Sequence, residues 1–145
     1  MSKSDIEDLI ICSSQNNSHY IPQDFCKSYL FNFRGTKRDI QNLESRSGIS
    51  SIFGLNAEHD KETLFNFLVS KNININKISP IDGFSQLHAA VLENNKSLVE
   101  KLLKSGVDKS VISSSTNNTA LELAQQLQLR GQEDYSEIVN ILSID

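Results

Sequence analysis

The side chains most able to act as catalysts or metal ligands in this chain are those of three histidines and two cysteines, and His88 lies in the most distinctive sequence segment. It lies in the segment DGFSQLHAA, between a leucine and two alanines. A metal site on a helix would need a second histidine, a cysteine or a carboxylate three or four residues further on. Valine and leucine stand at those two positions. The sequence therefore predicts no metal at His88, and we expect no cofactor elsewhere in the chain.

A second arrangement that could do chemistry is the spacing of Cys12, His19 and Cys26, which follow one another at intervals of seven. A thiol beside a histidine can act as a nucleophile activated by a base. No third group that would orient the histidine can be identified, and the chain has no glycine-rich phosphate loop, G-x-S-x-G or H-E-x-x-H motif. We expect a protein that is not an enzyme, with half-buried free thiols and a loop histidine. An enzyme with an unrecognised site is the alternative.

The overall charge argues against several classes of partner. The 145 residues carry a net charge of −4, and the one basic cluster, Arg34, Lys37 and Arg38, is balanced by Asp39 and Glu44. Nucleic-acid-binding surfaces are strongly basic. A membrane-spanning helix needs about 18 consecutive apolar residues, which no segment approaches. We expect no nucleic acid, membrane or small-molecule substrate as a partner.

The cysteine content and the N-terminus indicate a location. Two cysteines without a C-x-x-C pair do not form a disulfide framework, which favours a reducing, intracellular compartment. The N-terminal MSKSDIEDLIICSS lacks a long apolar core and has acidic residues where a signal peptide would be basic or apolar. The expected location is cytoplasmic.

An internal repeat organises most of the sequence. Residues 85–111 match residues 51–77 at a spacing of 34, which places Gly106 over Asn72. Glycine and asparagine are the residues that best tolerate the left-handed conformation in which a helix ends. A third copy begins 34 residues after the second, at Thr119.

Each copy predicts two short helices. In the middle copy Ser85 is the expected N-cap, and the spacing of apolar residues predicts a second helix over 96–104. The third copy has several extra residues in its middle. We expect its first helix to run on to Arg130 and to stop at Gly131, and its second helix to cover 136–143.

The middle copy resembles an ankyrin repeat. Its Ser85-Gln86-Leu87-His88-Ala89-Ala90 is similar to the family signature T-P-L-H-x-A, with serine for threonine and glutamine for proline. The resemblance extends over residues 48–145 and implies an all-α ankyrin-repeat solenoid. The repeats would occupy 48–81, 82–114 and 115–145, and residues 1–47 would form an N-terminal helical cap or a degenerate repeat.

The resemblance also implies structural roles for Ser85, Leu87, His88 and Gly106. In the family the signature histidine lies in the first turn of the inner helix and hydrogen-bonds within the repeat, which ties the helix start to the hairpin loop. In the third repeat Glu122 stands where this histidine would be. The resemblance therefore implies a weaker cap there.

In ankyrin proteins the residues around the hairpin turn and after the inner-helix signature contact partner proteins, and the resemblance implies the same here. In the middle repeat these residues are Ile81, Asp82, Phe84, Leu92 and Glu93. The equivalents in the other repeats are Glu58, His59, Ser115, Thr116, Asn118, Gln126 and Leu127. His59 is expected in the turn between two paired helices, and packing of Ile81 and Phe84 on the neighbouring repeat is the alternative to partner contact. We expect a monomer that binds another protein noncovalently, as an adaptor or inhibitor.

A more specific alternative is a secreted bacterial effector that binds a host protein in the host-cell cytoplasm. Asn, Ser, Lys and Ile are frequent, and the eukaryote-like repeat lies on a short chain. The C-terminal QEDYSEIVNILSID has acidic residues followed by apolar ones. In this it loosely resembles the translocation signals of some bacterial secretion systems.

Overall fold

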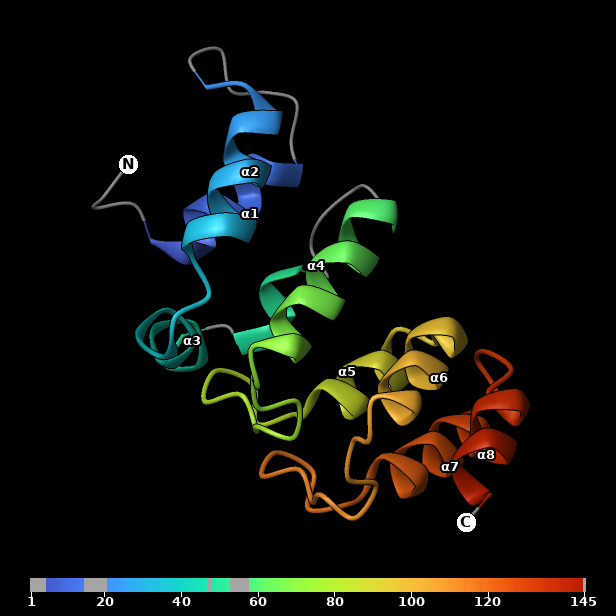
Figure 1. Ribbon diagram of the computed structural model, residues 1–145. Coiled ribbons are helices and arrows are strands. Elements are labelled where there is room, and N and C mark those ends of the chain that lie inside the picture. Colours follow the sequence, from blue (N-terminus) through green and yellow to red (C-terminus); the bar gives the residue numbers. More distant parts are fainter. Residues whose placement is uncertain (1–4, 15–20, 47, 53–57, 145) are drawn as a thin grey trace. The chain divides into compact units, whose positions relative to one another are not determined.

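Helices, joined by turns, make up all the regular secondary structure in the part of the chain that the structure describes (Figure 1). This computed structural model describes residues 5–14, 21–46, 48–52 and 58–144. The prediction of an all-α fold class is confirmed for these residues. The chain divides into two compact units, Met1–Asn74 and Ile75–Asp145. Among the described residues, no helix is long and apolar enough to cross a membrane.

The N-terminal unit starts with two helices that lie side by side, α1 (Ile6–Ser14) and α2 (Gln23–Phe33) (Figure 1). Apolar residues of α1, Ile6, Leu9 and Ile10, are buried, as is Leu30 of α2. Burial of such side chains stabilises a helix pair by roughly 1.5–3 kcal/mol for each one. Packing of apolar residues thus holds together two helices that are each too short to be stable alone.

A disulfide joins Cys12 of α1 to Cys26 of α2, with their Cα atoms 5.9 Å apart. The expectation of two free thiols is therefore wrong, because the hairpin of α1 and α2 brings together residues that are 14 apart in the sequence. Neither sulfur is a nucleophile in this state, and His19 lies outside the described residues. Without free thiols the sequence no longer favours a reducing compartment, and the cytoplasmic location stays a prediction.

Helix α3 (Lys37–Glu44) begins with a reciprocal cap. The Thr36 hydroxyl accepts a hydrogen bond from the Asp39 N–H at 3.2 Å, and the Asp39 carboxylate accepts from the Thr36 N–H at 3.1 Å. The same carboxylate accepts from Arg34 Nε at 3.1 Å and from Nη2 at 2.5 Å. Burial would raise the pKa of Asp39, but the hydrogen bonds from Arg34 and Thr36 outweigh it, and the pKa is lowered. One arginine of the basic cluster is thus committed to a structural ion pair.

A 3-10 helix, η1 (Gly48–Ile52), and α4 (Glu58–Ser70) complete the N-terminal unit. The prediction that His59 lies in a turn is wrong, because α4 begins one residue before it. Acidic residues at the first and third positions of α4 favour a helix start here through the helix dipole. Residues 48–74, assigned from the sequence to a first ankyrin repeat, belong to the same compact unit as residues 1–47.

The C-terminal unit consists of two helix hairpins, α5 (Gln86–Leu92) with α6 (Lys96–Lys104) and α7 (Ala120–Arg130) with α8 (Ser136–Ser143) (Figure 1). Helix α5 lies against α7 and α6 lies against α8, so the helices form two layers. The buried core comes from all four helices and includes Leu87, Ala90, Val91, Leu98, Val99, Leu102, Leu123, Ala124, Ile138 and Leu142.

Helix ends recur at the predicted spacing of 34. Ser85 and Thr119 are both N-caps, and each hydroxyl accepts a hydrogen bond from the N–H three residues further on. Asn72 and Gly106 follow the ends of α4 and α6 with φ of 62° and 82°, in the left-handed region. The predicted cap at Ser85, the helix over 96–104 and the stop at Gly106 are confirmed.

The long first helix of the last hairpin is also confirmed, since α7 runs to Arg130 and stops at Gly131, which has φ of 67°. Glu122 does not leave the start of α7 uncapped. Its carboxylate accepts a hydrogen bond from the Thr119 N–H at 2.8 Å, and the Thr119 hydroxyl accepts from the Glu122 N–H at 3.3 Å. Thr119 and Glu122 therefore cap α7 by bonding to each other. His88, in contrast, bonds to Asn118 in the turn before the next helix hairpin.

Candidate functional site

His88 lies in the first turn of α5 and has only 1% of its surface exposed. Its Nδ1 is 2.7 Å from the Ser85 hydroxyl, and its Nε2 is 2.9 Å from the backbone carbonyl of Asn118. A carbonyl oxygen can only accept, so Nε2 carries the proton and Nδ1 accepts from the serine. His88 therefore connects the start of α5 with the turn that precedes α7.

The buried imidazole is held in its neutral form. Burial lowers the pKa of His88 below 6.5, and the hydrogen bond to the Asn118 carbonyl opposes this shift without cancelling it. Both ring nitrogens are used in internal hydrogen bonds, and the ring lies beside that of Phe84, with centroids 6.2 Å apart. This environment lets His88 fix two segments to each other but gives it no open position for a substrate.

The lowered pKa of His88 predicts that stability depends on pH. Below pH 6.5 the unfolded chain takes up a proton that the folded chain resists, so the free energy of unfolding falls as the pH falls. Asp108 and Asp134 act outside this range, because hydrogen bonds from Ser110 and Ser136 lower their pKa below 3.8. We expect the thermal midpoint to drop between about pH 7 and pH 5, and to drop less in His88→Gln. Circular dichroism melts at a series of pH values measure this difference. If the midpoint fell equally with pH in both proteins, His88 would not be the group responsible.

Two turns lie against each other in the C-terminal unit, one at 79–84 before α5 and one at 113–118 before α7. In each turn the N–H of the fifth residue donates to the carbonyl of the first at 2.9 Å. The Gly83 carbonyl of the first turn accepts from the Ser113 hydroxyl at 2.8 Å and from the Ser114 N–H at 3.0 Å. Gly83 has φ of 76°, and a Cβ there would come within 2.9 Å of a backbone nitrogen of the second turn. The close contact of the turns therefore requires glycine.

Most of the predicted partner-binding residues of this unit are exposed. Ile81 is 84% exposed and Leu92 is 42% exposed. The others are Asp82, Glu93, Ser115, Thr116 and Gln126. We call these seven residues the turn face. Because the two turns are in contact and α5 packs on α7, equivalent residues of the two hairpins lie on neighbouring elements.

Other predicted residues are placed differently. Asn118 is only 5% exposed, and its amide donates to Gln126 Oε1 at 3.4 Å. The side chain is therefore used inside the unit, which corrects the prediction that Asn118 is presented to a partner. Phe84 and Leu127 are half-buried. The side chains of Glu58 and His59 lie outside the described residues.

The sequence-based assignment missed Ile112, which is 54% exposed and directly precedes the second turn. The sequence feature that could have revealed it is an apolar residue directly before the polar run SSSTNN. Together with Ile81 it gives an exposed isoleucine in or beside each of the two turns.

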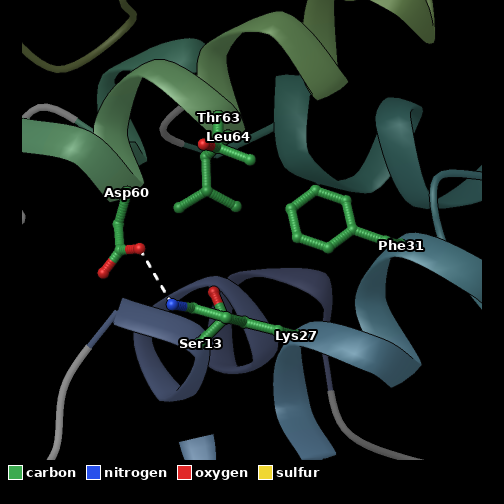
Figure 2. A pocket seen from close by; sticks show the side chains of 6 residues that line it. All are labelled: Ser13, Lys27, Phe31, Asp60, Thr63 and Leu64. Atoms are coloured by element: carbon green, nitrogen blue, oxygen red, sulfur yellow. Dashed lines mark ion pairs between the residues drawn. The ribbon is translucent and has the colours of Figure 1, made fainter. Parts of the chain in front are cut away.

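A cavity of about 210 Å³ lies in the N-terminal unit, between α1, α2 and α4 (Figure 2). It is lined by Ser13, Lys27, Phe31, Asp60, Thr63 and Leu64. Lys27 Nζ is 2.9 Å from Asp60 Oδ1, as the dashed line in Figure 2 marks. The Gln23 amide donates to the Ser13 carbonyl at 2.8 Å and to Asp60 Oδ2 at 3.4 Å. These groups are occupied with one another, so they connect three helices and do not present an open charge to a ligand.

A wider groove of about 430 Å³ follows the last hairpin, between α7 and α8. It is lined by Gln125, Gln128, Leu129, Ser136, Val139 and Asn140. None of these side chains is charged, and Leu129 is 88% exposed. The groove offers apolar contact and amide groups, without an acid, base or nucleophile.

Within the described segments, no group of three or more histidine, cysteine, aspartate or glutamate residues is arranged to hold a metal ion. No protein-family model, curated protein or solved structure matches this chain. The geometry defines an all-helical protein whose candidate site is a surface built on two contacting turns.

Proposed function

We propose that this chain carries an ankyrin-type repeat array and binds another protein noncovalently through the turn face. The support for the array is the recurrence of N-caps and left-handed helix ends at a spacing of 34, together with two turns that are closed by the same hydrogen bond. The histidine of SQLHAA bridges one turn-and-helix unit to the next. Stacked repeats of this kind present their turns as one continuous surface.

The observation that carries the proposed function is the exposure of Ile81 at the tip of a turn. A solvated turn normally carries polar residues, whereas protein interfaces use apolar anchors surrounded by polar groups. Asp82, Ser115 and Thr116 supply such a polar surrounding. Ile81 is 84% exposed, so its side chain adds little to the packing of the fold, and contact with a partner is the better explanation for an isoleucine at this position.

The turn that holds Ile81 is fixed before any partner arrives. The Ser79 hydroxyl accepts from the Ile81 N–H at 3.2 Å, and the Asp82 carboxylate accepts from the Phe84 N–H at 3.1 Å. The Ser79 N–H also donates to the Phe84 carbonyl at 2.9 Å. A turn held in this way loses little conformational freedom on binding, which favours affinity. The proposed activity is surface complementarity, by which the chain recruits or occupies its partner, and it includes no reaction.

Affinity capture tests this proposal. We expect the immobilised 145-residue chain to retain at least one protein from a cell lysate, and the double variant Ile81→Ser, Leu92→Ser to retain about tenfold less of it. Both side chains are exposed, so the melting curves should match those of the wild type. Leu129→Ser is the control, because Leu129 is 88% exposed and lies off the turn face. Equal capture by the wild type and the double variant would contradict the proposed interface.

The translocated effector stays the alternative proposal, with the host-cell cytoplasm as its location. Its support is the sequence pattern of the C-terminus. In the structure the apolar Ile138 and Leu142 of that segment are buried in α8. Deleting the segment would therefore disturb the fold as well as any signal, and exposed positions such as Glu137 are the better ones to change.

A further inference from the structure

The two charged residues of the turn face are both acidic, and each directly follows an exposed apolar residue. Asp82 follows Ile81 in the first turn, and Glu93 follows Leu92 at the end of α5. All four side chains are exposed, and neither carboxylate forms an ion pair with another described residue. We call Ile81 with Asp82, and Leu92 with Glu93, the two apolar–acid pairs.

The basic residues of the C-terminal unit lie on other elements. The largest group belongs to α6, in the second helix layer, and consists of Lys96, Lys101 and Lys104. Helix α5 has no basic residue, and α7 has only Arg130, its last one. Lys109 donates to the Ile144 carbonyl, and Lys77 is half-buried before the first turn. The charge that the turn face presents to a partner is therefore negative.

We propose that the turn face binds a protein segment with two lysine or arginine side chains, one for each apolar–acid pair. This inference rests on the proposed function and adds the chemistry of the partner. A lysine or arginine packs its long aliphatic stem on apolar surface while its charged head reaches a polar group. The stem would cover Ile81 or Leu92, and the head would pair with Asp82 or Glu93. One type of side chain thus satisfies both members of a pair.

The position of the pairs limits the spacing of the two basic residues. One pair lies in the turn before α5 and the other at the end of α5. The seven residues of α5 extend over about 10 Å at 1.5 Å per residue. An extended chain covers that distance in about three residues. We therefore expect the two basic residues to stand three or more positions apart in an extended segment.

The carboxylates and the apolar side chains have different tasks in this interface. Exposed ion pairs contribute little affinity, whereas complementary charge speeds association and disfavours partners of like charge. Apolar contact with Ile81 and Leu92 keeps the partner bound once it has arrived. Loss of the acids should therefore lower the association rate, and loss of the apolar residues should raise the dissociation rate.

A random peptide library selected on the immobilised 145-residue chain tests the chemistry of the partner. We expect the selected peptides to carry two basic residues three or more positions apart. Surface plasmon resonance with one such peptide should show association about three- to tenfold slower for Asp82→Asn, Glu93→Gln. Asparagine keeps an oxygen that can accept from the Phe84 N–H, so the turn is preserved.

A matched control removes two negative charges elsewhere. Asp8→Asn, Asp24→Asn changes exposed acids of the N-terminal unit and should leave the association rate unchanged. Circular dichroism melts check that each variant is folded.

The outcomes separate this inference from the proposed function. Selected peptides that lack basic residues but lose binding in Ile81→Ser, Leu92→Ser would overturn the inference and leave the proposed function standing. Equal association rates for the wild type and Asp82→Asn, Glu93→Gln would have the same meaning. A library that yields no peptide, or peptides that bind Ile81→Ser, Leu92→Ser as well as the wild type, would overturn both.

Discussion

Replacing Cys12 with serine is expected to lower the free energy of unfolding of the N-terminal unit by about 3 kcal/mol. The disulfide to Cys26 closes a loop of 14 residues, and a loop of that length loses roughly this much freedom in the unfolded chain when it is cross-linked. The effect is large for this unit because α1 and α2 are short and depend on packing with each other. Chemical denaturation followed by circular dichroism measures the loss.

Dithiothreitol provides the matched comparison. The wild type in reductant should be as unstable as Cys12→Ser, and Cys12→Ser, Cys26→Ser should not respond to reductant at all. Binding of a partner through the turn face should change little in these variants, since both cysteines lie in the other unit. Equal stability of the wild type with and without reductant would show that the disulfide does not contribute to stability.

Replacing His88 with alanine is expected to lower the free energy of unfolding of the C-terminal unit by about 1–3 kcal/mol. The change removes the hydrogen bonds to the Ser85 hydroxyl and to the Asn118 carbonyl, and it leaves the buried carbonyl without this partner. It also removes the packing of the imidazole beside the Phe84 ring. For a domain of this size each kcal/mol shifts the thermal midpoint by roughly 4–8 °C, so melting curves resolve the effect.

Two further variants separate the hydrogen bonds from other causes. His88→Gln keeps a donor that can reach the Asn118 carbonyl and should recover part of the loss. Glu93→Ala changes an exposed residue of the turn face and should leave the free energy of unfolding unchanged within about 0.5 kcal/mol. If His88→Ala melted like the wild type, His88 would not be the link between α5 and the following turn.

Much of the C-terminal unit can be predicted from the sequence because its signals are local. The N-cap at Ser85, the left-handed stop at Gly106 and the helix over 96–104 each depend on a few neighbouring residues. The long α7 follows from the extra residues before Gly131. The reciprocal cap of Thr36 and Asp39 is just as local, and its T-x-x-D spacing is the signal that sequence reasoning missed.

Contacts between distant segments could not be predicted in the same way. The pairing of Cys12 with Cys26 depends on how α1 and α2 fold back on each other, and two cysteines alone do not reveal it. The partner of His88 is the backbone carbonyl of Asn118, and a carbonyl has no residue-specific signature. Exposure of the turn residues was expected only through the ankyrin resemblance, and Asn118 shows that such an assignment fails where a side chain is used inside the fold.

The dissociation constant of the captured partner tests the central claim, that the turn face binds protein, most directly. It is measured by titrating the purified partner into the wild type and into Ile81→Ser, Leu92→Ser, with Leu129→Ser as the control. The predicted result is a loss of about tenfold or more in affinity for the double variant and no change for Leu129→Ser, at equal thermal stability. Equal dissociation constants for all three proteins would contradict the claim.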